Sequence, residues 1–233
     1  MVLSTQIARV SDGLPLAQSV DDSATEAALS EYKQQAKLLF RRISPQAEVR
    51  CTIESGPKYT FHYQIAPPPG RADAVVFLII TDRSYPRKLA FSYLDELAKE
   101  FERCYGAQVA QRNLRPYAFV GFDTFMQRTK RLYADTRSAQ TAVEEKAGGA
   151  NSLNRLNDDL QDVTSVMTKN MESLLWRGET LDQMSNMSSS LRDESLKYRK
   201  AAKQIRIDAL LRQYAPIGAI ALIFLFVLWV KFF

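Results

Sequence analysis

The residues that could perform chemistry in this chain are few, and they do not form a recognised catalytic set. His62 is the only histidine, so a pair of histidine metal ligands and most nucleophile–base dyads are excluded. The sequence contains no phosphate-binding loop, no G-x-G-x-x-G motif and no G-x-S-x-G nucleophile turn. We therefore expect no enzyme activity, no metal and no cofactor. We interpret His62 as a half-buried, hydrogen-bonded strand residue.

Other polar or reactive residues have simpler structural explanations. Asp82, Arg83 and Ser84 follow an apolar strand, but the sheet expected here is antiparallel, so a turn fits better than a ligand site. Cys51 and Cys104 are too few for a disulfide framework and lack metal-binding spacing, so we expect two small buried side chains. Four carboxylates at helical spacing are interpreted as the solvated face of one helix: Asp95, Glu96, Glu100 and Glu102.

The charge distribution favours a membrane over nucleic acid as the partner. The net charge is +5, but the basic residues of the first half are scattered and are not interleaved with aromatic residues. Basic residues concentrate just before an apolar C-terminal stretch, as the positive-inside rule expects for the cytosolic side of a span. These residues are Lys197, Arg199, Lys200, Lys203, Arg206 and Arg212.

Residues 1–137 carry the patterns of a packed α+β domain. The continuous apolar run at residues 75–80 is typical of a central strand that is buried on both faces. Strands are expected at residues 2–10, 14–20, 49–54, 59–65 and 74–80. Helices are expected to begin at the capping box Ser23-Ala24-Thr25-Glu26, at Pro86 and at Phe122. This order predicts a five-stranded antiparallel sheet with helices on both faces.

Residues 151–206 carry a different pattern, in which positions three and four apart alternate as in a coiled-coil seam. One helix cannot bury such a seam alone, so it needs partners. Arg177 lies near its middle. A buried unpaired arginine is costly, so partner helices must supply oxygen acceptors at that layer. The other seam positions are Leu153, Leu156, Leu160, Val163, Met167, Asn170, Leu174, Leu181, Met184, Ser188, Leu191, Ser195, Tyr198, Ala202 and Ile205.

The remaining segments are expected to connect these parts to a membrane. Residues 138–150 have no apolar period and are predicted to form a flexible linker. Residues 207–213 form a short juxtamembrane connector. Residues 214–233 are predicted to form a C-terminal transmembrane anchor, because an uncharged run of about 17 residues covers roughly 25 Å. The N-terminus lacks signal-peptide features, so we expect a single-pass tail anchor with a cytosolic N-terminus.

Five separate stretches carry a resemblance to known proteins: ARVSDGLPL at residues 8–16, YPRKLAFSYL at 85–94, RPY at 115–117, FDTF at 122–125 and LWRGE at 175–179. Together with the central Arg177 of the seam, they resemble the longin-domain R-SNAREs related to synaptobrevin. The similarity is greatest to the Sec-twenty-two-type SNAREs of endoplasmic reticulum–Golgi traffic. The resemblance covers nearly the whole chain.

This resemblance implies a profilin-like longin fold and a fusion function. Arg177 would be the zero-layer residue of a four-helix bundle with three Q-SNARE helices, from syntaxin-like proteins and relatives. Vesicle-coat, tethering and SNARE-disassembly factors would be further partners. The expected location is the membrane of the endoplasmic reticulum, Golgi and transport vesicles. In this family the SNARE segment can also fold back on the longin domain through an element that matches Asn170, Met171 and Glu172 here.

Three other functions remain open from the residues. A non-fusogenic tether at membrane contact sites would use the same bundle without mixing vesicle contents. A tail-anchored enzyme would need a catalytic set in the globular domain. A plain coiled-coil adaptor would self-associate through the seam, whereas an R-SNARE requires different partner helices.

Overall fold

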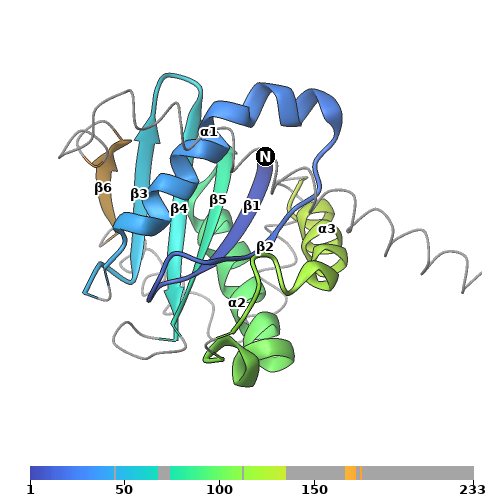
Figure 1. Ribbon diagram of the computed structural model, residues 1–233. Helices are drawn as coiled ribbons and strands as arrows, with labels where there is room; N and C mark the ends of the chain where they lie inside the picture. Colours follow the sequence, from blue (N-terminus) through green and yellow to red (C-terminus); the bar gives the residue numbers. More distant parts are fainter. Residues whose placement is uncertain (45, 68–73, 112, 135–165, 172–173, 175–233) are drawn as a thin grey trace, which may run out of the picture.

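The computed structural model describes residues 1–44, 46–67, 74–111, 113–134, 166–171 and 174 (Figure 1). The predicted linker, connector and transmembrane anchor lie outside these residues. Within the described part of the chain, no helix has the length and apolar character needed to cross a bilayer.

The centre of the domain is a sheet whose first five strands are antiparallel. The strands are β1 (Val2–Arg9), β2 (Pro15–Gln18), β3 (Arg50–Ser55), β4 (Tyr59–Ala66), β5 (Val75–Asp82) and β6 (Met167–Asn170). Their order across the sheet is β2-β1-β5-β4-β3-β6. The apolar strand β5 pairs with β1 and β4, so the predicted central strand is confirmed.

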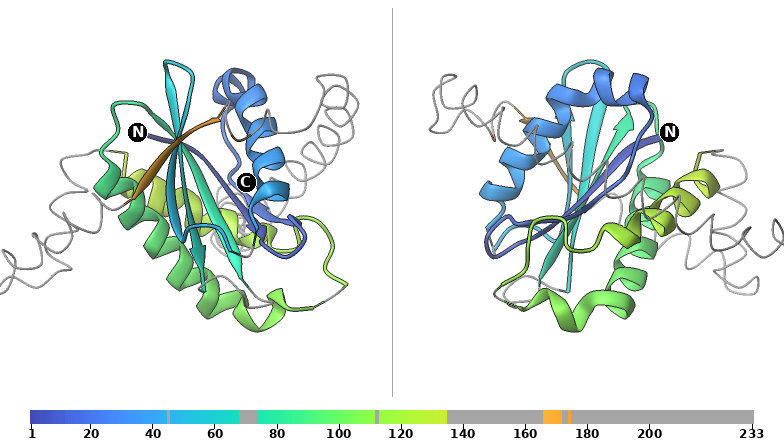
Figure 2. Two further views of the ribbon diagram at one scale, coloured as in Figure 1. Left: turned by 90° about the vertical axis from the view of Figure 1, so that its left-hand side faces the viewer. Right: turned by 45° about the vertical axis from the view of Figure 1, so that its right-hand side comes forward.

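Helices cover both faces of the sheet, as predicted (Figure 2). Helix α1 (Ser23–Arg42) packs on one face, above a core that includes Leu29, Ile53 and Phe61. Helix α2 (Arg87–Val109) packs on the other face, above a core that includes Phe77. Successive β5 side chains point to opposite faces, which is why its unbroken apolar run supplies both cores.

The ends of the helices differ from the sequence prediction by a few residues. The cap of α1 is Asp22, whose carboxylate accepts a hydrogen bond from the Thr25 backbone N–H, and not Ser23. A short 3₁₀ helix, η1 (Val120–Phe122), precedes α3 (Asp123–Leu132). The predicted helix at residues 122–136 therefore begins later and ends earlier.

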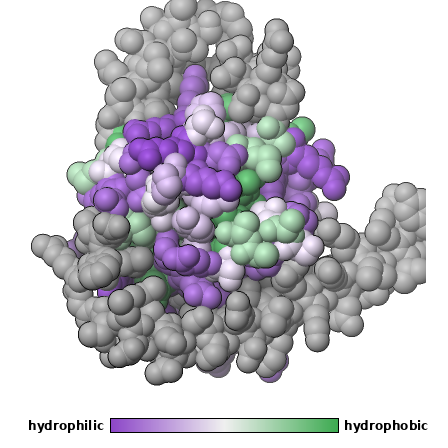
Figure 3. Space-filling view, turned by 90° about the horizontal axis from the view of Figure 1, so that it is seen from above, coloured by the Kyte–Doolittle hydropathy of each residue, from purple (hydrophilic) through white to green (hydrophobic). Residues whose placement is uncertain are grey.

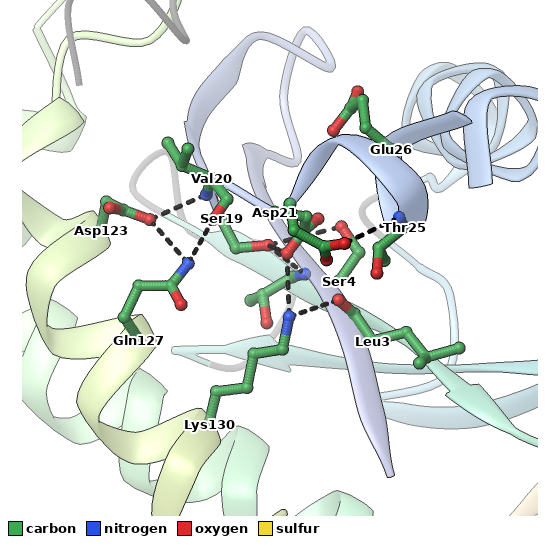
Figure 4. A network of polar contacts seen from close by, with 12 residues as sticks. Leu3, Ser4, Ser19, Val20, Asp21, Thr25, Glu26, Asp123, Gln127 and Lys130 are labelled. Atoms are coloured by element: carbon green, nitrogen blue, oxygen red, sulfur yellow. Dashed lines mark hydrogen bonds and ion pairs between the residues drawn. The ribbon is translucent and has the colours of Figure 1, made fainter. Parts of the chain in front are cut away.

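Polar contacts attach α3 to the β1–β2 side of the domain (Figure 4). The Lys130 ammonium donates to the Leu3 carbonyl and to the Asp21 carboxylate. The Asp21 side chain is fully buried and also accepts from Lys33 Nζ at 2.7 Å. Burial alone would raise the pKa of Asp21, but the charges of Lys33 and Lys130 lower it. This buried carboxylate therefore joins α1 and α3.

The described face of the domain that is seen from above is mostly polar. Seen from above, hydrophobic side chains form only small areas between hydrophilic ones (Figure 3).

Cys104 is exposed, so the prediction that both cysteines are buried is correct only for Cys51. The buried face of α2 continues from Phe101 to Val109, and Cys104 lies to one side of it.

One strand of the sheet was not expected. The prediction assigned residues 151–206 to a helix throughout, but β6 lies inside that range and pairs in parallel with β3. The prediction of five antiparallel strands is correct for β1–β5, and β6 extends the sheet to six. Parallel pairing is possible because a long connection separates the two strands in sequence.

Candidate strand-docking site

The candidate site is the edge of the sheet where β6 lies beside β3 (Figure 1). The register places Cys51 opposite Met167 and Glu54 opposite Asn170. Because β6 comes from the seam region, this edge joins the globular domain to the segment predicted to bind partner helices. The site is a contact between two functional parts of one chain.

The residues that flank β6 attach it to both cores. Val166 is 9% exposed and belongs to the core on the α2 face. Met171 is 3% exposed and belongs to the core on the α1 face, against which Leu174 also packs. Burial of a side chain of this size contributes about 1.5–3 kcal/mol before ordering costs. These two residues are therefore the main apolar anchors.

Polar contacts hold the same segment from the side of α1. The Arg42 guanidinium donates to the Leu174 carbonyl at 2.5 Å. Lys169 Nζ lies 2.5 Å from the Glu48 carboxylate, and both side chains are partly exposed. The hydrogen bond from Lys169 lowers the pKa of Glu48, against a smaller opposing effect of burial. The pair thus favours the docked strand as long as Glu48 is ionised.

Cys51 lies on β3, in register with Met167 of the docked strand. Its side chain is fully buried, and burial raises the pKa of its thiol. A buried thiol with a raised pKa reacts slowly, because the thiolate is the nucleophile. Cys51 therefore offers a native chemical probe for the presence of β6.

The seam residues in the described part face outward or lie at the margin of this site. Met167 is 49% exposed, and Asn170 is also exposed. Leu174 is half-buried. Of the three residues predicted to form the fold-back element, Met171 is buried, Asn170 is exposed, and Glu172 lies outside the described residues. Arg177 and all the other seam residues also lie outside the described residues.

Sequence reasoning missed Val166, Lys169, Glu48 and Arg42. One local signal could have indicated Val166: Val166 and Met171 are apolar, lie outside the seam, and are five positions apart. In an extended strand that spacing places two side chains on opposite faces. Glu48 and Arg42 had no local signal, because their partners are more than one hundred residues away.

The groups that could have suggested an enzyme have structural roles. His62 is 1% exposed, and its Nδ1 lies 3.0 Å from the Thr52 hydroxyl. Burial, with a contribution from Arg87, lowers the pKa of His62 to about 3. It is therefore neutral and more deeply buried than predicted. Asp82 accepts a backbone hydrogen bond from Tyr85, which confirms the predicted turn. Among the described residues that line a cavity of about 290 Å³ beside α2, only Glu102 is ionisable.

Comparisons with known proteins identify both parts of the chain. A Longin family model, described as a regulated-SNARE-like domain, matches residues 16–126. A Synaptobrevin family model matches residues 152–232, the range that contains β6. The chain is thus similar to two adjacent modules of SNARE proteins.

Several relatives align with this chain over nearly the full length of both proteins. Protein transport protein sec22 of Schizosaccharomyces pombe is 50% identical, with all of both chains covered. Protein transport protein SEC22 of Yarrowia lipolytica is 51% identical, with 98% of each chain covered. The 25.3 kDa vesicle transport protein SEC22-1 of Arabidopsis thaliana is 44% identical, covering 99% of this chain and 98% of that protein. The chain therefore belongs to the Sec22 family of SNARE transport proteins, which join a longin domain to a synaptobrevin region.

Proposed function

We propose that this protein is the R-SNARE of vesicle transport between the endoplasmic reticulum and the Golgi, and that its longin domain holds the SNARE segment inactive until partners arrive. The observation that supports this proposal most directly is β6. A strand from the synaptobrevin region lies on the edge of the longin sheet. The same residues are expected to be helical in a SNARE bundle, so docking and assembly exclude each other.

The free energy that holds the docked segment is small enough for docking to be reversible. Its apolar anchors are Val166 and Met171, and its ion pair is partly exposed. Two buried side chains and a surface pair contribute a few kcal/mol, from which the cost of ordering the segment must be subtracted. Assembly of a four-helix bundle over residues 151–206 buries a much larger apolar seam. Assembly of the bundle can therefore displace the segment from the longin domain.

Arg177 would determine how many partner helices join that bundle. Its guanidinium has five N–H donors, and burial in an apolar seam requires acceptors for them. Three glutamine side chains, one from each Q-SNARE helix, supply neutral oxygens at one layer. Leu174 and Leu181 would exclude water on both sides and strengthen these hydrogen bonds.

The membrane anchor would convert assembly into force. Residues 207–213 are too few to allow the bundle to move far from the proposed anchor at 214–233. Assembly that proceeds from Leu153 toward Ile205 therefore brings the two membranes together. The basic residues before the anchor would lie against anionic headgroups.

The test is fusion of liposomes that carry the full-length chain with liposomes that carry Q-SNAREs. We expect Arg177→Ala to reduce capture of the Q-SNAREs and Met184→Asp to abolish both assembly and content mixing. The longin domain should remain folded in both variants, because neither residue belongs to residues 1–137. Stable assembly and fusion by Met184→Asp would contradict the proposal.

The same assay separates the rival functions. A non-fusogenic tether would dock the liposomes without mixing their contents. A self-associating adaptor would form oligomers of this chain alone and would not need the Q-SNAREs. Either result would replace the fusion function with that rival.

A further inference from the structure

The two edges of the sheet are covered in different ways. At the β2 edge, the backbone N–H groups of Tyr117 and Phe119 donate to the carbonyls of Pro15 and Leu16 at 2.7 and 3.1 Å. That covering segment lies between two helices of the domain, so it is a fixed part of the fold. The β3 edge is covered by β6, which comes from the synaptobrevin region. This second cover therefore comes from outside the domain predicted at residues 1–137.

The connection to β6 is much longer than the fold requires. The described chain leaves α3 on the β1–β2 side, whereas β6 lies at the opposite edge of the sheet (Figure 1). Six strands span roughly 24 Å, at about 4.8 Å per strand spacing. Residues 135–165 can reach up to roughly 100 Å, at about 3.3 Å per residue. The β3 edge of a neighbouring copy therefore lies within reach.

We propose that β6 docks reciprocally between two copies of this chain, so that each copy covers the β3 edge of the other. The proposal rests on the docked state of the proposed function and adds a second form of it. Every contact is retained in the exchange: Val166 enters the core on the α2 face, Met171 enters the core on the α1 face, and Lys169 pairs with Glu48. Domain exchange of this kind adds no new interface that must be stabilised.

Because the contacts are the same, local concentration decides between the two forms. A tether of this length holds its own strand at an effective concentration on the order of 1 mM. Dispersed molecules therefore dock their own strand. Copies gathered on a small area of membrane exchange strands, and both SNARE segments then remain docked. Exchange would thus keep a concentrated pool inactive without any additional protein.

The register provides a direct test, because Cys51 lies opposite Met167. Neighbouring strands are about 4.8 Å apart, which lies inside the Cα–Cα range of disulfides. One full-length variant keeps Cys51 and carries Cys104→Ser. The other carries Met167→Cys with Cys51→Ser and Cys104→Ser. Each variant then has a single thiol, because the chain has only two cysteines. Mild oxidation of the pair in phosphatidylcholine liposomes can join them only across two copies.

We expect a disulfide-linked dimer whose fraction rises as the protein-to-lipid ratio increases. Addition of Met171→Asp to the second variant should reduce that fraction at least tenfold, because the buried anchor is lost. If the dimers formed by random collision or through the seam alone, Met171→Asp would leave the fraction of disulfide-linked dimer unchanged. That result would overturn the proposal.

A third full-length variant, with Met167→Cys and Cys104→Ser but with Cys51 retained, tests docking within one chain. If it forms an internal disulfide and the mixed pair forms none at any density, exchange is wrong and the docked state stands. If it forms no internal disulfide either, the docked state itself is wrong, and the regulatory part of the proposed function fails with it.

Discussion

Lys169 and Glu48 form an ion pair beside the outer strand of the sheet, and the pair adds a small contribution to the apolar anchors that hold the SNARE segment. The pair lies at the surface, with side-chain exposures of 30% and 39%. Such pairs contribute about 0.5 kcal/mol or less. The lowered pKa of Glu48 means that this contribution is present above the ordinary glutamate pKa and is lost as pH falls through the lowered value. At neutral pH the pair is fully formed.

Reversing one charge should therefore loosen the strand measurably. We expect Lys169→Glu, made in a Cys104→Ser chain, to increase the alkylation rate of Cys51 several-fold, because attraction becomes repulsion beside Glu48. The double variant Lys169→Glu with Glu48→Lys should restore slow alkylation. If the double variant reacted as fast as the single one, the pair would not contribute to docking.

At the residue scale, the period of the sequence predicts a seam, which stays a prediction, but it does not indicate which residues the longin domain buries. Met171 was identified only through the family resemblance, and Val166 was not identified. A 3.5-residue period describes one helical face, whereas burial in the docked segment follows the two-residue period of a strand. The same residues carry both patterns. Only the helical pattern extends over enough residues to be recognised in the sequence.

At the element scale, the strands β1–β5 and the three main helices were predicted close to their observed positions. Their signals are local: turn residues, helix caps and apolar periodicity. The strand β6 had no comparable signal, because a four-residue strand at an edge forms only when β3 is already present. Family membership in a group of transport SNAREs also confirms the prediction that the chain is not an enzyme.

The contact between α1, α3 and the sheet depends on one buried carboxylate. Asp21→Ala would leave Lys33 with a buried charge, partnered only by Glu26 at 2.6 Å. Loss of one partner from a buried pair costs about 3–5 kcal/mol. We expect this loss in the free energy of unfolding of the full-length chain, measured in urea by the near-ultraviolet dichroism of its buried tyrosines.

A matched surface pair provides the control for this prediction. Glu100 pairs with Arg103, whose side chain is 72% exposed, so Glu100→Ala should leave the free energy of unfolding nearly unchanged. Equal effects of the two variants would show that the buried network does not stabilise the domain.

At the scale of the whole molecule, the proposed function requires one segment to present different residues to the longin domain and to partner helices. The longin domain buries Met171, which lies outside the seam, and leaves the seam residue Met167 half exposed. A helical bundle would bury Met167 and leave Met171 outside the seam. The two states therefore compete for the same backbone while they depend on different side chains. This separation allows each state to be weakened without direct damage to the other.

Two methionine substitutions in the full-length chain should consequently have opposite effects on assembly with Q-SNAREs. Met171→Ser removes an anchor worth about 1.5–3 kcal/mol, which corresponds to roughly a 10- to 100-fold weaker docked state. We expect faster assembly and an unchanged melting temperature of the bundle. Met167→Ser leaves the docked state intact but removes a seam contact, so assembly should be no faster and the bundle should melt at a lower temperature. The outcome that contradicts this prediction is an assembly rate that changes in the same direction in both variants, together with a melting temperature that also does so. It would mean that docking and assembly use the same face of this segment.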